Sequence, residues 1–216
     1  MTVQKNRISR RNFTGAALGS VATLAGCSRG MAQDMMTPTA GGPEGPFFPV
    51  DFPTDSDADL TQINGRADRA AGQVIQVHGR VLNRLGNPIE GARLRLWQAN
   101  AAGRYHHPDD ISTAPLDPNF QSYADLRTGT DGAWRITTIK PGGYDSPIGH
   151  RTPHIHGRIA DAVRELTTQM YFSDEAELNA EDGLFRDLGA LAPTAIAEAD
   201  SASPNIYRWT IILDRT

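Results

Sequence analysis

The chain has 216 residues, of which 39% are hydrophobic, and this is enough for one domain with its own core. Its single cysteine, Cys27, excludes a disulfide framework in the rest of the chain. The formal net charge of −4 argues against nucleic acid as a partner, because contact with phosphates needs a basic surface.

Residues 1–32 have the features of an export signal, and we do not expect them to join the fold. The pair Arg10-Arg11 lies in a basic segment without acidic residues, and an apolar stretch rich in glycine and alanine follows from Gly15 to Ala25. This pattern is typical of a twin-arginine export signal, which a receptor reads and which does not span the membrane. It predicts a protein that is periplasmic or lipid-anchored at the cell envelope.

The end of this signal allows two kinds of processing. The sequence LAGC, ending at Cys27, resembles a lipobox, in which Cys27 would carry a lipid anchor and become the mature N-terminus. Cleavage after Ala32 is the alternative and would discard Cys27. Loss of residues 1–26 removes four basic residues and no acidic one, which leaves 17 basic against 25 acidic residues and a net charge of −8.

The segment before the first strand has two parts. Residues 28–42 are small, polar and contain Pro and Gly, which predicts a tether. The next residues, GGPEGPFFPVDFP at positions 41–53, combine several Pro and Gly with three phenylalanines. This composition predicts an extended segment that lies on the surface of the domain.

The rest of the chain predicts strands far more than helices. Apolar and polar residues alternate over 73–81 and again over 92–97, and β-rich runs follow at 132–139 and 206–213. Only 174–191 has a weak helical pattern, which Gly183 and Gly189 interrupt. Short strands with turn signals predict an all-β domain over residues 33–216, either a β-sandwich or a barrel, with little helix.

Two histidines two positions apart are the first candidate for a site. His154 and His156 would point to the same face of a strand, which suits the binding of one metal ion by two imidazoles. A pair of this kind is weak evidence alone, since such residues can also simply face a polar interior. Tyr105 and Tyr144 each follow a turn rich in Gly or Pro that could aim a phenol inward. A tyrosinate ligand needs a strongly charged cation, which favours ferric iron over zinc.

Three motifs in this order carry a resemblance to a known family. They are GRY ending at Tyr105, TIKPGGY ending at Tyr144, and RTPHIH from Arg151 to His156. With the residues around them, from about Pro43 to Phe172, they resemble the intradiol ring-cleavage dioxygenases, and among these the iron-binding chain of protocatechuate 3,4-dioxygenase.

The resemblance implies a role for each of these positions. It implies a β-sandwich with long active-site loops and one non-haem Fe(III) per chain, held by four ligands: Tyr105, Tyr144, His154 and His156. It also implies that Arg151 lies beside the substrate ring, that Tyr144 doubles as a base, and that Gln169 lines the same pocket. The implied reaction inserts both atoms of O₂ into a catechol, such as a protocatechuate-like one, between its two hydroxyl-bearing carbons, giving a cis,cis-muconate-type diacid.

The resemblance also bears on assembly, and the sequence departs from the family pattern at three positions. A homo-oligomer, or a related second chain, is expected. Thr152 stands where the family usually has proline, and Asp145 and Gly157 are also unusual, which predicts that these two residues reshape the pocket.

A second interpretation comes from a different class of protein. The residues around the turn GNPIEG and the strand GAWRITTI also resemble transthyretin-like β-sandwich modules, which bind or brace and do not catalyse. Such modules have no reason to carry Tyr105, Arg151, His154 and His156 together, so the enzyme is the leading interpretation.

Overall fold

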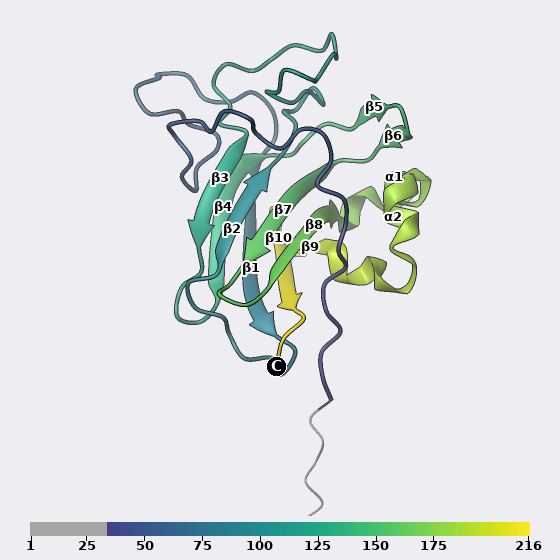
Figure 1. Ribbon diagram of the computed structural model, residues 1–216. Coiled ribbons are helices and arrows are strands. Elements are labelled where there is room, and N and C mark those ends of the chain that lie inside the picture. The colour runs from purple at the N-terminus through teal and green to yellow at the C-terminus, as the bar shows by residue number, and fades with distance from the viewer. Residues whose placement is uncertain (1–33) are drawn as a thin grey trace, which may run out of the picture. The chain divides into compact units, whose positions relative to one another are not determined.

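The computed structural model describes residues 34–216, and the structural statements below concern this part of the chain. The predicted export signal and Cys27 lie outside the described residues. The described strands are β1 (Val74–Asn83), β2 (Arg93–Trp97), β3 (Tyr123–Arg127), β4 (Ala133–Ile139), β5 (Tyr144–Ser146), β6 (Gly149–Arg151), β7 (His154–Ala160), β8 (Glu165–Phe172), β9 (Ile196–Asp200) and β10 (Ser203–Leu213). The helical elements are the 3-10 helices η1 (Ser173–Glu175) and η2 (Gly189–Ala195) and the α-helices α1 (Ala176–Glu181) and α2 (Gly183–Asp187) (Figure 1).

Eight of the strands form two layers. The order β3-β2-β7-β8 makes one layer and β9-β10-β1-β4 the other, and they join where Tyr171 and Phe172 of β8 pair in parallel with β9. Buried side chains from both layers form one hydrophobic cluster, with Leu94 and Ile159 on one side and Val77 and Ile136 on the other. The predicted all-β fold is thus confirmed, and it is a β-sandwich.

The alternation of apolar and polar residues in the sequence corresponds to an alternation of buried and exposed side chains in the strands. In β1, Ile75, Val77 and Val81 are buried while most of their neighbours are not. In β10, Tyr207, Trp209 and Ile211 follow the same rule. Residues two apart lie on one face of a strand, so each run presents its apolar side chains to the core. The short helices also fall where the weak helical pattern was seen, with breaks at Asp182 and Leu188.

The prediction of a tether over residues 28–42 is wrong for residues 36–42. The Thr39 amide donates to the Ile212 carbonyl at 3.0 Å, and the Thr39 hydroxyl accepts from the Ile212 amide at 2.8 Å. The Gly42 amide donates to the Thr167 carbonyl at 2.9 Å. Small polar residues are typical of linkers. Here, however, they form hydrogen bonds with backbone groups of strand residues that would otherwise lack a hydrogen-bond partner.

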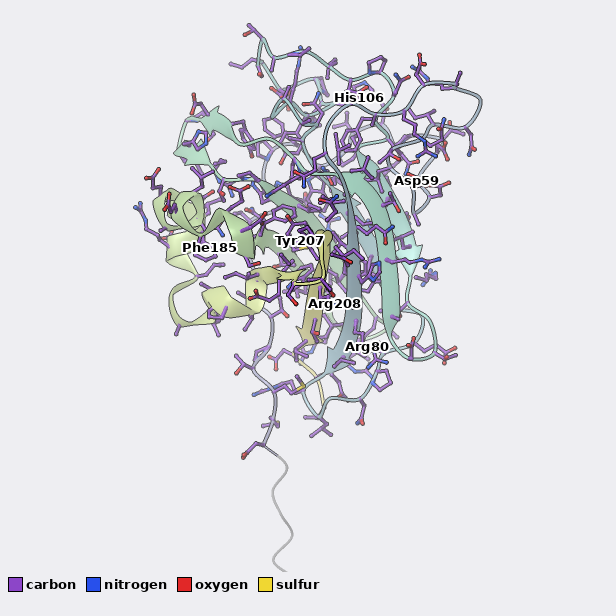
Figure 2. The ribbon with its side chains drawn as sticks, turned by 180° about the vertical axis from the view of Figure 1, so that it is seen from behind. Asp59, Arg80, His106, Phe185, Tyr207 and Arg208 are labelled. Carbon is purple, nitrogen blue, oxygen red and sulfur yellow. The ribbon has the colours of Figure 1, made fainter. Side chains whose placement is uncertain are left out.

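The loops that build the candidate site lie at one end of the sandwich. His106 lies among them, whereas Arg80 lies toward the other end (Figure 2). The small β5–β6 hairpin projects at the loop end (Figure 1). The segment around Phe47 and Phe48 packs on the outer face of the β2–β7 layer, against Trp97 and Tyr105, as the sequence predicted for a surface segment.

Candidate metal centre

Four side chains meet at the loop end of β7. Tyr105 comes from the loop after β2, Tyr144 from β5, and His154 and His156 from β7. The Tyr105 hydroxyl lies 3.1 Å from His156 Nε2 and 3.4 Å from His154 Nε2, and the two Nε2 atoms are 3.1 Å apart. The Tyr144 ring centre is 5.4 Å from that of Tyr105 and 5.7 Å from that of His154. The structure therefore brings all four candidate ligands together.

The spacing of the three closest donor atoms suits one metal ion. Donors bound about 2.1 Å from one ion and at right angles to each other lie about 3.0 Å apart. The observed separations of 3.1, 3.1 and 3.4 Å are close to this value. His154 Nδ1 is 2.7 Å from the Thr152 carbonyl oxygen, so Nδ1 carries the hydrogen and Nε2 turns a lone pair toward the cluster.

The electrostatics of the cluster favour neutral imidazoles and call for a strong cation beside the phenols. Burial, reinforced by the charge of Arg151, lowers the pKa of His154 to about 3 and holds the pKa of His156 well below its ordinary value. Burial also raises the pKa of Tyr105 and of Tyr144. In the described residues, no group of three or more His, Cys, Asp and Glu side chains could hold a metal, so a centre here would require the tyrosines.

Glycines without room for a side chain hold the two tyrosines close. Gly103 has φ +76°, and a Cβ there would lie 2.3 Å from the Gly143 carbonyl oxygen. A Cβ on Gly142 would lie 2.5 Å from the Ala101 carbonyl oxygen. The loops that end in Tyr105 and Tyr144 thus pack backbone against backbone, which only glycine permits.

Aromatic rings hold the ligand rings from the side opposite the core. Trp97 is directly across from His156 in the β2–β7 pairing, and the two rings stack with centres 4.9 Å apart and an angle of 10°. Phe47 stacks on Tyr105 at 4.6 Å. Trp97 is buried under the N-terminal segment on the outer face of the β2–β7 layer, and it fixes the plane of a candidate ligand.

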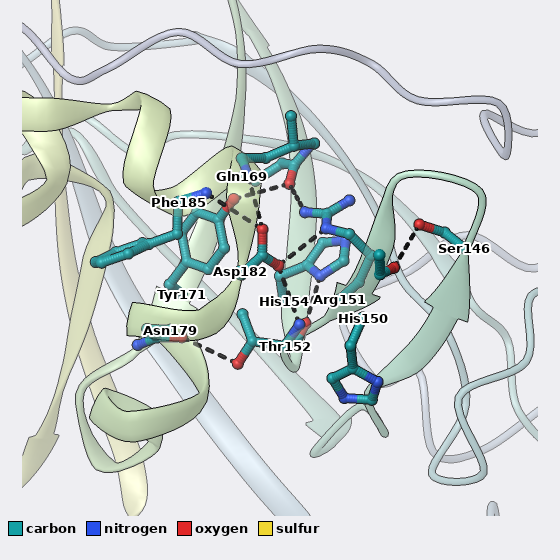
Figure 3. Close-up of polar contacts among 12 residues, drawn as sticks. Ser146, His150, Arg151, Thr152, His154, Gln169, Tyr171, Asn179, Asp182 and Phe185 are labelled. Carbon is teal, nitrogen blue, oxygen red and sulfur yellow. Dashed lines mark hydrogen bonds and ion pairs between the residues drawn. The ribbon is translucent and has the colours of Figure 1, made fainter.

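Arg151 is buried beside this cluster and is held by a carboxylate (Figure 3). Its Nε donates to Asp182 Oδ2 at 2.9 Å, and one terminal nitrogen donates to Gln169 Oε1 at 2.5 Å. Burial lowers the pKa of Arg151, but the charges of Tyr144 and Asp182 outweigh this effect, so the pKa is raised. Arg151 is therefore a fixed positive charge whose direction Asp182 and Gln169 determine.

Asp182 also anchors the backbone directly after Arg151, where β6 ends. Its Oδ2 accepts the backbone amide of Thr152 at 3.0 Å, while Oδ1 accepts the amides of Leu184 and Phe185 as the N-cap of α2. Proline at position 152 would have no N–H to donate. Thr152, one of the departures from the family pattern, thus supplies a bond that the usual residue cannot make.

Gln169 lies directly across from His156 in the β7–β8 pairing. Besides accepting from Arg151, its Oε1 accepts from the Tyr171 hydroxyl at 3.0 Å, and its Nε2 donates to the Pro43 carbonyl at 2.9 Å. Both the oxygen and the nitrogen of the Gln169 amide are hydrogen-bonded. Gln169 therefore fixes the positions of Arg151 and of the N-terminal segment relative to the candidate ligands.

A cavity of about 1070 Å³ opens beside the cluster. Tyr144, Arg151, His156 and Gln169 line it, so the candidate ligands and the positive charge face one space. Tyr105 and His154 are also buried, but they do not line it.

Of the two residues expected to reshape this pocket, the structure places only one in its lining. Asp145 lines the cavity. Gly157 does not, because it points from β7 to the face opposite His156. A Cβ there would meet Ile159 Cδ1 at 3.0 Å and Leu96 Cδ2 at 3.4 Å, which are core atoms.

Sequence reasoning missed Asp182 and the use of the Thr152 amide. Asp182 lies 31 positions after Arg151, so no local spacing connects them. A weak signal existed, because an aspartate directly before Gly183 and the apolar Leu184 is typical of a helix N-cap. This signal could have indicated a helix cap, but it says nothing of the arginine.

Comparisons with known proteins agree with this geometry. Residues 43–214 match a family model described as "Dioxygenase". Over 135 residues the chain is 41% identical to a protocatechuate 3,4-dioxygenase beta chain from Burkholderia cepacia, covering 60% of this chain and 57% of that one. It is 28% identical to a catechol 1,2-dioxygenase from Acinetobacter lwoffii, covering 78% and 62%. The matched region thus spans about three fifths of these relatives.

A solved structure gives the same result for the fold. The dioxygenase domain of a dioxygenase carbohydrate-binding protein fusion from Streptomyces sp. SirexAA-E is 30% identical, with a TM-score of 0.63. The match covers 83% of this chain and 100% of that domain. The family model covers well over half of the chain, and the motifs meet in one place. The chain belongs to the intradiol ring-cleavage dioxygenase family.

Proposed function

We propose that this protein is a non-haem Fe(III) intradiol dioxygenase that inserts both atoms of O₂ into a catechol, between its hydroxyl-bearing carbons. The observation that carries the proposal is the convergence of two phenols and two imidazoles, with three donor atoms 3.1–3.4 Å apart, in a domain of this family. The transthyretin-like binding module gains no support from the comparisons, which are with dioxygenases.

The donor set fits a ferric ion held by Tyr105, Tyr144, His154 and His156. Burial keeps the imidazoles neutral, so they can act as ligands, and it opposes ionisation of the phenols unless a strong positive charge is close. When bound, Fe(III) supplies Lewis acidity toward the two catechol oxygens and draws electron density from the ring.

The residues around the metal position supply proton transfer and charge. Tyr144 is half-buried and lines the cavity, whereas Tyr105 is buried. With a cation bound to keep it ionised, the Tyr144 phenolate oxygen would be the one able to take a proton from an incoming catechol hydroxyl. Arg151 provides a fixed positive charge that stabilises negative charge developing on the substrate. Gln169 holds the guanidinium in that direction through its 2.5 Å contact.

Visible absorption after loading with iron tests the proposal. The loaded full chain should bind close to one iron per chain and show a tyrosinate-to-iron band, and it should consume O₂ with a catechol. Tyr105→Phe should abolish or strongly change the band. Tyr207→Phe is the matched control, because Tyr207 is buried in the core and contacts Asp174. The absorption band of this variant should equal that of the wild type. A folded protein that takes up no iron, or a band unchanged in Tyr105→Phe, would contradict the proposal.

We propose further that the protein is exported by the twin-arginine route and that Cys27 carries a lipid. Arg10-Arg11 and the lipobox-like LAGC support this. Labelled fatty acid should appear on the wild type and be absent from Cys27→Ala, and changing both arginines to lysine should block export. Unchanged export, or no label on the wild type, would contradict it. In the described residues no helix is long and apolar enough to cross a membrane.

The assembly is proposed to be a homo-oligomer or a complex with a related second chain. The support is that the Burkholderia relative is named as a beta chain. Light scattering of the purified chain gives the mass directly, and an active monomer would contradict both forms.

A further inference from the structure

The cavity beside the candidate centre is larger than one aromatic ring requires. Its volume of about 1070 Å³ lies just above the roughly 300–1,000 Å³ typical of sites for drug-sized ligands. A single ring with two hydroxyl groups would leave most of this space to water. The size therefore points to a substrate that carries a substituent beyond the catechol ring.

Much of the wall and mouth of the cavity is apolar away from the candidate ligands. Phe47 and Leu184 contribute to the wall. At the mouth, Ile111 is 94% exposed and Ile148 is 66% exposed, on two different loops. Large apolar side chains exposed together at the rim of a cavity are typical of a surface that an apolar group covers.

The charges around the cavity are unfavourable for an anion. Among the described residues that line it, Asp109, Asp110 and Asp145 are acidic and Arg151 is the only arginine or lysine. Arg151 already forms a buried ion pair with Asp182. A carboxylate on the substrate would lose water and find no unengaged cation in exchange, which costs free energy.

The three carboxylates also do not form a site for a cation. Asp110 accepts the backbone amides of Tyr105 and Ser112, at 2.6 and 2.8 Å. The side chain of Asp145 is 93% exposed and contacts His150, and that of Asp109 is 77% exposed. Exposed charges act weakly on a ligand of either sign, so these residues do not form a binding site for an amine. The cost to a carboxylate is instead the loss of its water without an unengaged cation in exchange.

We infer that the substrate is a catechol bearing an uncharged, apolar substituent, such as an alkyl, aryl or ester group, and that carboxylated catechols are poor substrates. The inference rests on the proposed function, because it takes the cleaved ring to lie against Tyr144, His156 and Arg151. The substituent lies along the apolar wall and reaches Ile111 and Ile148 at the mouth.

A matched pair of substrates isolates the charge. Protocatechuate and its methyl ester share one ring and differ in a carboxylate against an uncharged group. The ester should have a kcat/KM at least about tenfold higher, as expected for desolvating an unpaired charge. The ester withdraws more electron density from the ring, which opposes attack on O₂, so intrinsic reactivity works against the predicted order.

A second comparison isolates size and the sign of the charge. Each fully buried methylene contributes about a fourfold factor, so the butyl ester should exceed the methyl ester several-fold. The compound 4-ethylcatechol should be at least as good as 4-(2-aminoethyl)catechol. Preference for the acid, for the amine or for the smaller ester would overturn the inference. If the iron-loaded chain cleaves none of these catechols, the proposed function itself has failed.

A variant at the mouth tests the location. Ile148→Lys places a cation where the substituent should lie, and it should lower the ester-to-acid ratio of kcat/KM by about threefold or more. Val163→Lys is the matched control: Val163 is 70% exposed in the turn after β7, beyond Ala160, which is itself about 13 Å from His156 along the strand. Its ratio should equal that of the wild type. Equal ratios in both variants would overturn the proposed position of the substituent.

Discussion

Asp182→Asn should destabilise the protein strongly although it keeps the size of the side chain. The carboxylate of Asp182 is fully buried and accepts four hydrogen bonds, two through each oxygen. The asparagine side chain has one oxygen, which can replace Oδ1 as the acceptor that caps α2. Its NH₂ group would then face Arg151 Nε and the Thr152 amide, two donors that would lose their acceptor.

The magnitude follows from the buried charge. Removal of one partner of a buried ion pair typically costs about 3–5 kcal/mol, because the remaining charge has no compensation. Arg151 is only 5% exposed, so water does not replace the lost carboxylate. For a domain of this size about 2–4 °C of Tm corresponds to 1 kcal/mol, so we expect Tm to fall by roughly 6–20 °C.

Urea unfolding at equal iron content measures the effect, and a second substitution identifies its cause. Arg151→Met in the Asp182→Asn protein removes the unpaired guanidinium and should recover much of the lost stability. Asp187→Asn, at the end of the same helix, controls for a change of charge on α2. A loss below about 1 kcal/mol for Asp182→Asn, or strictly additive effects of the two substitutions, would refute the ion-pair reasoning.

Three further outcomes are expected. Gly79→Ala should cost about 1–3 kcal/mol in urea unfolding, because its Cβ would lie 2.3 Å from the Trp134 ring, whereas Gly183→Ala meets nothing within 4 Å and should be neutral. The hydrogen bond from Arg93 lowers the pKa of Asp125, so this carboxylate stabilises the fold above its ordinary pKa of about 4 and the contribution is lost in acid. Asp125→Asn should therefore reduce the drop in unfolding free energy between neutral pH and about pH 3; an unchanged drop would contradict this. Removal of iron by a chelator should lower Tm, since a ligand bound only to the native state stabilises it by about 2.7 kcal/mol at 100 times its Kd; an equal Tm would argue against a structural contribution of the metal.

Local patterns predicted much of the fold and of the candidate site, because local geometry determines both. Alternation with a period of two placed the strands around Val77 and Leu94 and put His154 beside His156. The glycines before Tyr105 and Tyr144 predicted tight turns, and these turns are what bring the phenols together.

What the sequence did not predict depends on contacts between distant residues. Residues 36–42 have the composition of a linker, but Thr39 pairs with Ile212 far along the chain, which composition does not encode. Gly157 was expected to reshape the pocket because it departs from the family pattern, yet the pleat of β7 turns this position to the core. In both cases contacts with residues distant in the sequence determine the local structure, and local composition does not reveal them.

Thr152 and Asp182 are best understood as one feature. Without the Thr152 amide, Asp182 Oδ2 would serve Arg151 alone, and without Asp182 the buried amide and guanidinium would both lack an acceptor. The hydroxyl of Thr152 extends the contact to α1, where it donates to Asn179 Oδ1 at 3.0 Å. The carbonyl of Thr152 meanwhile accepts His154 Nδ1, so one residue links the helices, the positive charge and a candidate ligand. The departure from proline therefore does not weaken the loop; it ties the orientation of Arg151 to that of His154.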